Sequence, residues 1–314
     1  MVMNGGTVTA ADVEAAAERV QDRVRRTPVL EVEPDLFGTP GRVVVKLEHL
    51  QHMGVFKVRG AFANLLDGRV PDAGVIAASG GNHGLSVAYA ARELGVTAEV
   101  FVPVSSSPVK VARLRTLGAH VTQTGDWYAD ALAASLARAE QTGARVLHAY
   151  DQHGTVAGQG TLGRELAAQA PGVDTVLVAV GGGGLAAGIA AALEGRAHVV
   201  GVEPEHCPTW RAASEAGEPV DVEVGGVAAD ALGARRLGQI PYGVLRRTGA
   251  SSVLVPDEAL REARRLLWDR LRVAAEVGAC APVAALLTGA YAPERGDRVA
   301  VIVCGANTDP SDLS

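Results

Sequence analysis

The sequence has no run of basic residues, and its acidic residues outnumber its basic ones. The 29 Lys and Arg residues stand against 35 Asp and Glu residues, so the net charge is −6 at pH 7. Nucleic acids and anionic membrane surfaces bind proteins with basic patches, and the sequence therefore disfavours both partners. With 314 residues, 48% of them hydrophobic, the chain is long enough to bury a sizeable core. These properties favour small-molecule chemistry.

Cysteine is scarce as well. Cys207, Cys280 and Cys304 form no CxxC pair, and their odd number leaves a thiol unpaired. This pattern argues against a zinc knuckle and for a reducing compartment. The first six residues lack the basic and then apolar pattern of a signal peptide. We therefore expect a cytoplasmic protein.

The one uncharged run of nearly membrane-spanning length, 175–193, contains four consecutive glycines. Each glycine costs about 1 kcal/mol in a helix relative to alanine. A buried strand, a turn and a helix fit this run better than a membrane span does.

Periodicity predicts alternating strands and helices along most of the chain. Strands are expected at 42–47, 75–79, 98–102, 120–123, 146–150, 176–180, 199–202 and 299–303. Helices are expected at 11–24, 60–66, 84–94, 108–117, 128–142, 160–170, from 185 and from 257. The alternation is typical of parallel sheets, and so many strands favour two α/β domains with the site between them. Residues 217–250 show no helical period and are expected to be irregular.

Lysine is represented by Lys46, Lys57 and Lys110 alone. Lys57 stands between the apolar residues Phe56 and Val58. It lies between a predicted strand end and a predicted helix start. Partial burial would lower the pKa of its amine and make it usable as a nucleophile. The alternative is a solvated lysine in the first turn of a helix.

Four glycines, 181–184, follow one predicted strand and precede a helix. In such a turn successive backbone N–H groups point toward an anion at the helix N-terminus, and a phosphate is the natural ligand. A tight turn that binds nothing is one alternative. A dinucleotide fingerprint is another, because residues 182–187 satisfy GxGxxA and Glu203 follows at the end of the next strand. That reading predicts an NAD-dependent oxidoreductase.

A second glycine-rich turn, Ser79–Gly84, opens another predicted helix. Its backbone N–H groups could bind a carboxylate, and the Asn82 amide could donate to a phenolate or carbonyl oxygen. His83 is a candidate base, although a structural hydrogen-bonding role is the simpler interpretation. Two anion-binding turns and one buried amine together fit a ligand with a phosphate and an aldehyde, and a substrate with a carboxylate.

With these motifs the chain resembles the pyridoxal-phosphate enzymes of fold type II, in the branch of threonine and serine dehydratases and serine racemase. The resemblance covers nearly the whole chain, and its motifs occur in the right order. They are 55–61 (VFKVRGA), 79–84 (SGGNHG), 156–161 (VAGQGT), 181–185 (GGGGL) and 303–307 (VCGAN).

The resemblance implies a tryptophan synthase β-like fold of two three-layer α/β domains, and a homodimer. The large cofactor-binding domain would comprise residues 1–69 and 148–314, and the small domain residues 70–147. Lys57 would hold pyridoxal phosphate as an imine and act as the catalytic base. The implied cofactor contacts are Phe56, Lys57, Asn82, Gly181, Gly182, Gly183, Gly184 and Cys304. The implied substrate contacts are Ser79, Gly80, Gly81, Asn82 and His83.

Cys304 corresponds to the position that faces the pyridine nitrogen in this family. A neutral thiol there leaves the nitrogen largely unprotonated, which suits loss of a β-leaving group better than a long-lived carbanion. We therefore expect an ammonia-lyase that removes water from L-threonine, L-serine or a related β-hydroxy amino acid. A racemase of the same family is the nearest alternative.

Several residues depart from the family pattern. Val55 and Met53 stand where Ser and Thr are common, which predicts a more apolar pocket. The racemase branch binds a divalent cation with a Glu, here Glu203, and an Asp, here Thr209, so no metal is expected at this position. Gly80 aligns with the serine that supplies the second proton in serine racemases, which favours elimination over racemisation.

Overall fold

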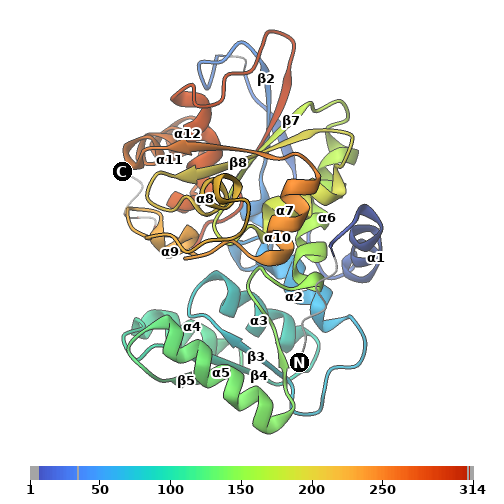
Figure 1. The fold of residues 1–314 in the computed structure, drawn as a ribbon, viewed down its shortest axis with the longest axis vertical. Helices are drawn as coiled ribbons and strands as arrows, with labels where there is room; N and C mark the ends of the chain where they lie inside the picture. Colours follow the sequence, from blue (N-terminus) through green and yellow to red (C-terminus); the bar gives the residue numbers. More distant parts are fainter. Residues whose placement is uncertain (1–6, 34, 310, 312–314) are drawn as a thin grey trace.

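The protein folds into two lobes, each built on its own β-sheet (Figure 1). The structure, a computed structural model, describes residues 7–33, 35–309 and 311. Residues 1–6, on which the signal-peptide prediction rests, lie outside the described residues. Two mostly parallel sheets with flanking helices confirm the expected α/β fold class.

The upper lobe contains a six-stranded sheet. All neighbouring strands in it are parallel except β1 and β2. Its inner strand β7 (Thr175–Ala179) is buried along its whole length, which explains its uninterrupted apolar sequence. The order across the sheet is β1 (Val29–Glu31), β2 (Arg42–Lys46), β10 (Arg298–Ile302), β7, β8 (His198–Pro204) and β9 (Ser251–Val255).

The lower lobe contains a four-stranded, entirely parallel sheet. Its strands all come from one continuous part of the chain, whereas those of the upper sheet come from both sides of that part. The chain therefore leaves the upper lobe once and returns once. The order across this sheet is β5 (His120–Gln123), β4 (Ala98–Val102), β3 (Val75–Ala78) and β6 (Arg145–Val146).

Helices cover the sheets of both lobes (Figure 1). The first helix begins at a capping box between Thr9 and Asp12. Among the described residues no helix is long and apolar enough to cross a membrane. The helices are α1 (Ala10–Val20), α2 (Lys57–Leu65), α3 (Asn82–Glu93), α4 (Pro108–Thr116), α5 (Tyr128–Thr142), α6 (His153–Gln169), α7 (Gly184–Ala192), α8 (Thr209–Ala216), α9 (Ala229–Leu232), α10 (Gln239–Arg247), α11 (Asp257–Leu271) and α12 (Ala281–Leu287).

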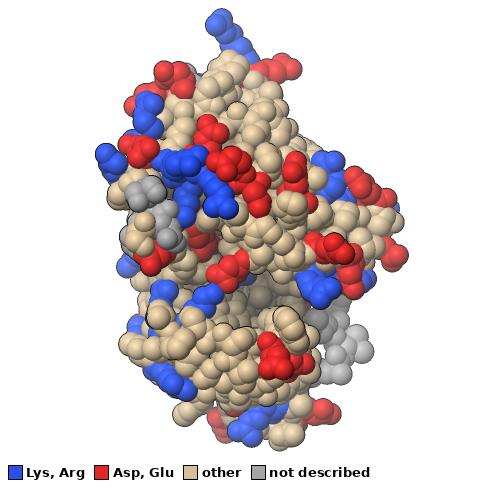
Figure 2. Space-filling model, turned by 90° about the vertical axis from the view of Figure 1, so that its left-hand side faces the viewer, with Lys and Arg blue, Asp and Glu red and all other residues tan. Residues whose placement is uncertain are grey.

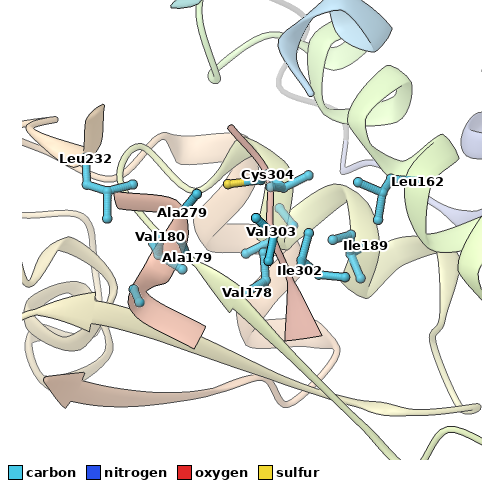
Figure 3. Close-up of a cluster of buried hydrophobic side chains, with 14 of the residues drawn as sticks. Leu162, Val178, Ala179, Val180, Ile189, Leu232, Ala279, Ile302, Val303 and Cys304 are labelled. Carbon is cyan, nitrogen blue, oxygen red and sulfur yellow. The ribbon is translucent and has the colours of Figure 1, made fainter. Parts of the chain in front are cut away.

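The core of the upper lobe is centred on β7 and β10. Figure 3 shows Val178 of β7 and Ile302 of β10 together with Leu162 of α6 and Ile189 of α7. All four side chains are fully buried. Cys304, just beyond the end of β10, borders the same cluster (Figure 3), so the apolar core supports the residues at the carboxyl ends of these strands.

Helix α6 begins seven residues before the predicted start at 160, because its glycines serve packing and not turning. A Cβ atom at Gly158 would lie 2.6 Å from the Cβ atom of Ala63 in α2. One at Gly160 would lie 2.6 Å from the carbonyl oxygen of Gly188 in α7. The glycines therefore allow α2, α6 and α7 to approach closely, at a cost in helix propensity.

Other boundaries also differ from the prediction. The strand expected at 146–150 ends at Val146, and the helix expected at 60–66 begins at Lys57. Residues 217–250 contain α9 and α10 and are not wholly irregular. Strands β1 and β9 were not predicted. Strand β1 has only three residues, and both strands are partly exposed, so neither shows a clear hydrophobic pattern.

A buried network of ion pairs attaches α2 to the upper lobe. Arg59 bonds to Glu48 through Nε at 2.6 Å and to Glu165 of α6 through Nη2 at 2.9 Å. Lys46, at the end of β2, also bonds to Glu165 and donates to the Thr27 carbonyl oxygen at 2.6 Å. The side chains of Arg59, Glu48 and Lys46 are at most 1% exposed. This network holds the first turn of α2, where Lys57 lies.

Replacement of Glu48 by alanine should lower the free energy of unfolding by about 3–5 kcal/mol, because it leaves part of the Arg59 charge buried without a partner. Chemical denaturation followed by circular dichroism measures the change. Asp72→Ala, which removes an exposed pair with Arg69, is the control and should change little. An equally small effect of Glu48→Ala would contradict the prediction.

Candidate active site

A cavity lies where the two lobes meet. It encloses about 520 Å³, open solvent at its mouth included. Figure 2, a side view, shows a hollow between the lobes and charges of both signs mixed over this face. All of the predicted cofactor contacts line the cavity, although they come from four distant parts of the chain: Phe56, Lys57, Asn82, Gly181, Gly182, Gly183, Gly184 and Cys304.

Lys57 is the first residue of α2, and its side chain is partly buried. Its Nζ atom donates to the Ala149 carbonyl oxygen at 3.1 Å and lies 5.1 Å from the centre of the Phe56 ring. Burial lowers the pKa of Lys57 to about 8, although the nearby Cys304 and Glu276 oppose the shift. A substantial fraction of the amine is therefore neutral near physiological pH, as nucleophilic attack requires. The interpretation as a solvated surface lysine is wrong.

The turn 181–184 connects β7 to α7, and its four residues all line the cavity. Gly183 has φ +88°, a conformation that favours glycine. A Cβ atom at Gly182 would lie 2.2 Å from the ring of Tyr150, so only glycine fits there. The turn thus presents bare backbone and the positive end of the α7 dipole to the cavity, which suits an anion such as a phosphate.

The turn at Ser79–Gly84 opens α3 in the lower lobe, and Asn82 is its only residue that lines the cavity. The Ser79 hydroxyl accepts the backbone N–H of Gly81 at 3.3 Å, which shapes the turn. His83 is buried, and its Nε2 lies 2.8 Å from the Leu147 carbonyl oxygen. Burial, and then the charge of Lys57, lower the pKa of His83 to about 3, so it is a neutral structural histidine.

Cys304 lies two residues beyond β10 and is 4% exposed. Burial raises the pKa of its thiol well above the ordinary value. The thiol therefore stays neutral at physiological pH, as expected from the sequence.

Two residues of the cavity wall with polar side chains, Tyr150 and Glu276, were not predicted from the sequence. Tyr150 covers the glycine turn, and burial raises the pKa of its hydroxyl to about 12, with the charge of Tyr128 contributing. Glu276 is 8% exposed and accepts from Asn82. A signal for Glu276 did exist, because it is the only charged residue in 273–293.

Glu203 does not face the cavity but caps α8. Its carboxylate accepts the backbone N–H of Trp210 at 2.6 Å and of Arg211 at 2.9 Å, and the hydroxyl of Ser252 at 2.8 Å. It is fully buried, and burial raises its pKa to about 7 despite these bonds. A carboxylate used in this way is not available to a dinucleotide ribose, so the dehydrogenase alternative loses its acidic residue.

Met53 and Val55 are not cavity-lining residues. Met53 has φ +59°, and its carbonyl oxygen accepts from Asn307 at 3.1 Å. Val55 is fully buried and pairs with the backbone of Gly305. These two substitutions therefore shape the backbone around Lys57, and the pocket walls do not become more apolar through them.

Known proteins of one family resemble this chain along nearly its whole length. A family model described as pyridoxal-phosphate dependent enzyme matches residues 20–305. The phenylserine dehydratase of Ralstonia pickettii is 40% identical, over 98% of this chain and 97% of that protein. The threonine deaminase of T.th. is 37% identical, with a TM-score of 0.88 over 96% of this chain and 99% of that one. Maize serine racemase is 27% identical, with a TM-score of 0.91 over 98% and 96% of the two chains.

Treatment with a chelator should leave the thermal midpoint unchanged, because the Glu203 oxygens already accept hydrogen bonds where a cation would need them. Glu203→Ala should lower the midpoint by about 2–6 °C, since α8 loses its N-terminal cap. Differential scanning fluorimetry with chelator and with magnesium measures both. A chelator-induced fall that magnesium reverses would show a cation site.

Proposed function

This chain belongs to the family of pyridoxal-phosphate-dependent enzymes, and on that premise we propose how its residues carry out the reaction. The protein is a lyase of the dehydratase type, which removes water from a β-hydroxy amino acid to give a 2-oxo acid and ammonia. The observation that carries the proposal is the amine of Lys57, which faces a cavity between an anion-binding glycine turn and the Asn82 turn.

The residues present fit pyridoxal phosphate. The four glycines 181–184 line the cavity without side chains at the N-terminus of α7, where a phosphate binds well. Lys57 supplies a partly neutral amine for covalent attachment of the aldehyde. When bound, the cofactor withdraws electrons from the α carbon of the amino acid.

Each residue then has a proposed task. Lys57 holds the cofactor and removes the α proton, because its amine titrates near the working pH. Gly181–Gly184 would hold the phosphate, and Phe56 and Asn82 would contact the ring and its oxygen. The backbone of residues 79–83 orients the substrate carboxylate. Cys304 would lie beside the ring of the cofactor as a neutral thiol, which favours rapid elimination.

We assign the two lobes to the two domains expected from the sequence. Residues 70–147 contain every strand of the lower sheet, and residues 1–69 and 148–314 contain every described strand of the upper sheet. The lower lobe would carry the substrate carboxylate, and the upper lobe the cofactor. The homodimer and the cytoplasmic location remain predictions.

The substrate class includes L-serine and L-threonine and, in our proposal, 3-phenylserine. The relative named phenylserine dehydratase is similar to this chain along its whole length. Tyr150 and Leu232 give the cavity aromatic and aliphatic surface, against which an aryl group on the β carbon could pack. In the described residues the Tyr150 hydroxyl makes no hydrogen bond, so it stays available to a substrate in the cavity.

Borohydride reduction of the holoenzyme should attach a pyridoxyl group to the peptide that contains Lys57, and mass spectrometry of the digest locates it. Lys46, which is buried in ion pairs, and Lys110, which pairs with Asp230, are internal controls. A protein that is colourless with pyridoxal phosphate, or label on a control lysine, would overturn the assignment.

The unmodified enzyme should form 2-oxo acid and ammonia from L-serine, L-threonine or L-3-phenylserine, with little D-amino acid. Lys57 serves one face of the cofactor, and Gly80 offers no proton donor on the other. A Cβ atom at Gly80 would lie 3.4 Å from Val102, so Gly80→Ser fits and should gain some racemisation. Chiral chromatography measures both products.

D-serine formed by the unmodified enzyme as fast as 2-oxo acid would contradict this prediction. His83 could not then be the donor, because its ring is buried and bound to Leu147. Ser106 is the candidate to test by Ser106→Ala, since its Oγ atom would lie 3.6 Å from a Cβ atom at Gly80.

A further inference from the structure

The side-chain amide of Asn82 forms hydrogen bonds through both its nitrogen and its oxygen. Its Nδ2 atom donates to the two carboxylate oxygens of Glu276, at 2.9 and 3.0 Å. Its Oδ1 atom accepts from Nδ2 of Asn307 at 2.6 Å. A carboxylate accepts hydrogen bonds and does not donate them. Glu276 therefore fixes the orientation of the Asn82 amide, with the nitrogen toward Glu276 and the oxygen toward Asn307.

The arrangement leaves one N–H of Asn82 free. The two oxygens of one carboxylate lie close together, whereas the two N–H bonds of an amide point widely apart, so a single hydrogen of Nδ2 serves both oxygens of Glu276. The described residues offer the second hydrogen no other acceptor. Asn82 lines the cavity, so that second N–H is available to a ligand. If the amide were turned over, its oxygen would face an oxygen of the cofactor ring, and the two would repel each other.

The same contacts join the two lobes. Asn82 begins α3 of the lower lobe, whereas Glu276 and Asn307 belong to the upper lobe. Arg113 of α4 donates to Oδ1 of Asn307 at 3.0 Å and extends the connection. Glu276 is itself held, because its backbone N–H donates to the Gly305 carbonyl oxygen at 3.0 Å and a Cβ atom at Gly305 would lie 2.1 Å from its Oε1 atom.

From this geometry we propose that Glu276 is a positioning residue, which fixes the Asn82 amide so that an N–H points to the ring oxygen of pyridoxal phosphate. The inference rests on the proposed function, because it concerns the cofactor of that site. Glu276 acts through Asn82, and its contribution to cofactor binding depends on the Asn82 side chain.

The test is a double-mutant cycle on the affinity for pyridoxal phosphate, measured by fluorescence titration of the cofactor-free protein. Glu276→Gln keeps the size of the side chain but replaces one acceptor oxygen by a donor. It should weaken binding on the order of ten-fold, as loss of one well-placed hydrogen bond does. In an Asn82→Ala background the same substitution should change binding by less than about two-fold, because the two residues act as a unit.

A second variant changes the hydrogen bond that the oxygen of the Asn82 amide accepts. Asn307→Asp places an oxygen against Oδ1 of Asn82 and should weaken binding with Asn82 present but not in the Asn82→Ala background. The unfolding midpoint of the cofactor-free protein shows whether Glu276→Gln folds. If Glu276→Gln does not fold, Asn307→Asp tests the inference in its place. The visible absorption band of the bound cofactor should shift in both single variants, which a purely structural role would not cause.

Equal losses of affinity in the two backgrounds would overturn the inference, because Glu276 would then act independently of Asn82, for example through its charge near Lys57. Unchanged affinity in Glu276→Gln would overturn it too. Failure of the unsubstituted protein to bind pyridoxal phosphate would instead overturn the proposed function, so the two failures are distinguishable.

Discussion

Burial of the Lys57 amine is the constraint on which the rest of the site depends. An ammonium group in this position is poorly solvated, so its pKa falls to about 8 and the neutral amine becomes accessible. The amine stays in place because α2 is fixed two residues later, where Arg59 is paired with Glu48 and Glu165. This buried network of ion pairs thus supports the position of Lys57 without contacting its amine.

The two lobes supply opposite halves of the ligand site for a common geometric reason. In parallel sheets the loops after the carboxyl ends of the strands collect at one edge, and ligands bind there. The turn 181–184 follows β7 in the upper sheet, and the turn at Ser79–Gly84 follows β3 in the lower one. The cavity between the lobes is therefore bordered by two helix N-termini, which suits a ligand pair with a phosphate and a carboxylate.

The sequence was most informative where local physics decides the structure. The short motif around Lys57 and the four-glycine turn each carry their signal in a few residues, and both line the cavity as expected. Prediction from the sequence was poorer where packing between helices and strands determines the structure. The glycines of α6 looked unfavourable for a helix, yet they permit its contacts with α2 and α7. Met53 and Val55 were expected to alter the pocket walls, but lie behind them.

By itself the sequence determined the α/β class, the family and those cavity residues that lie in short motifs at strand ends, because such motifs are set by backbone geometry and side-chain chemistry nearby. Only the tertiary structure decided the partners of those residues. Glu276 reaches Asn82 across 194 positions of the chain, and Glu203 turns away from the cavity to cap α8. Such pairings depend on how the two sheets are placed in space, and no local pattern encodes that placement.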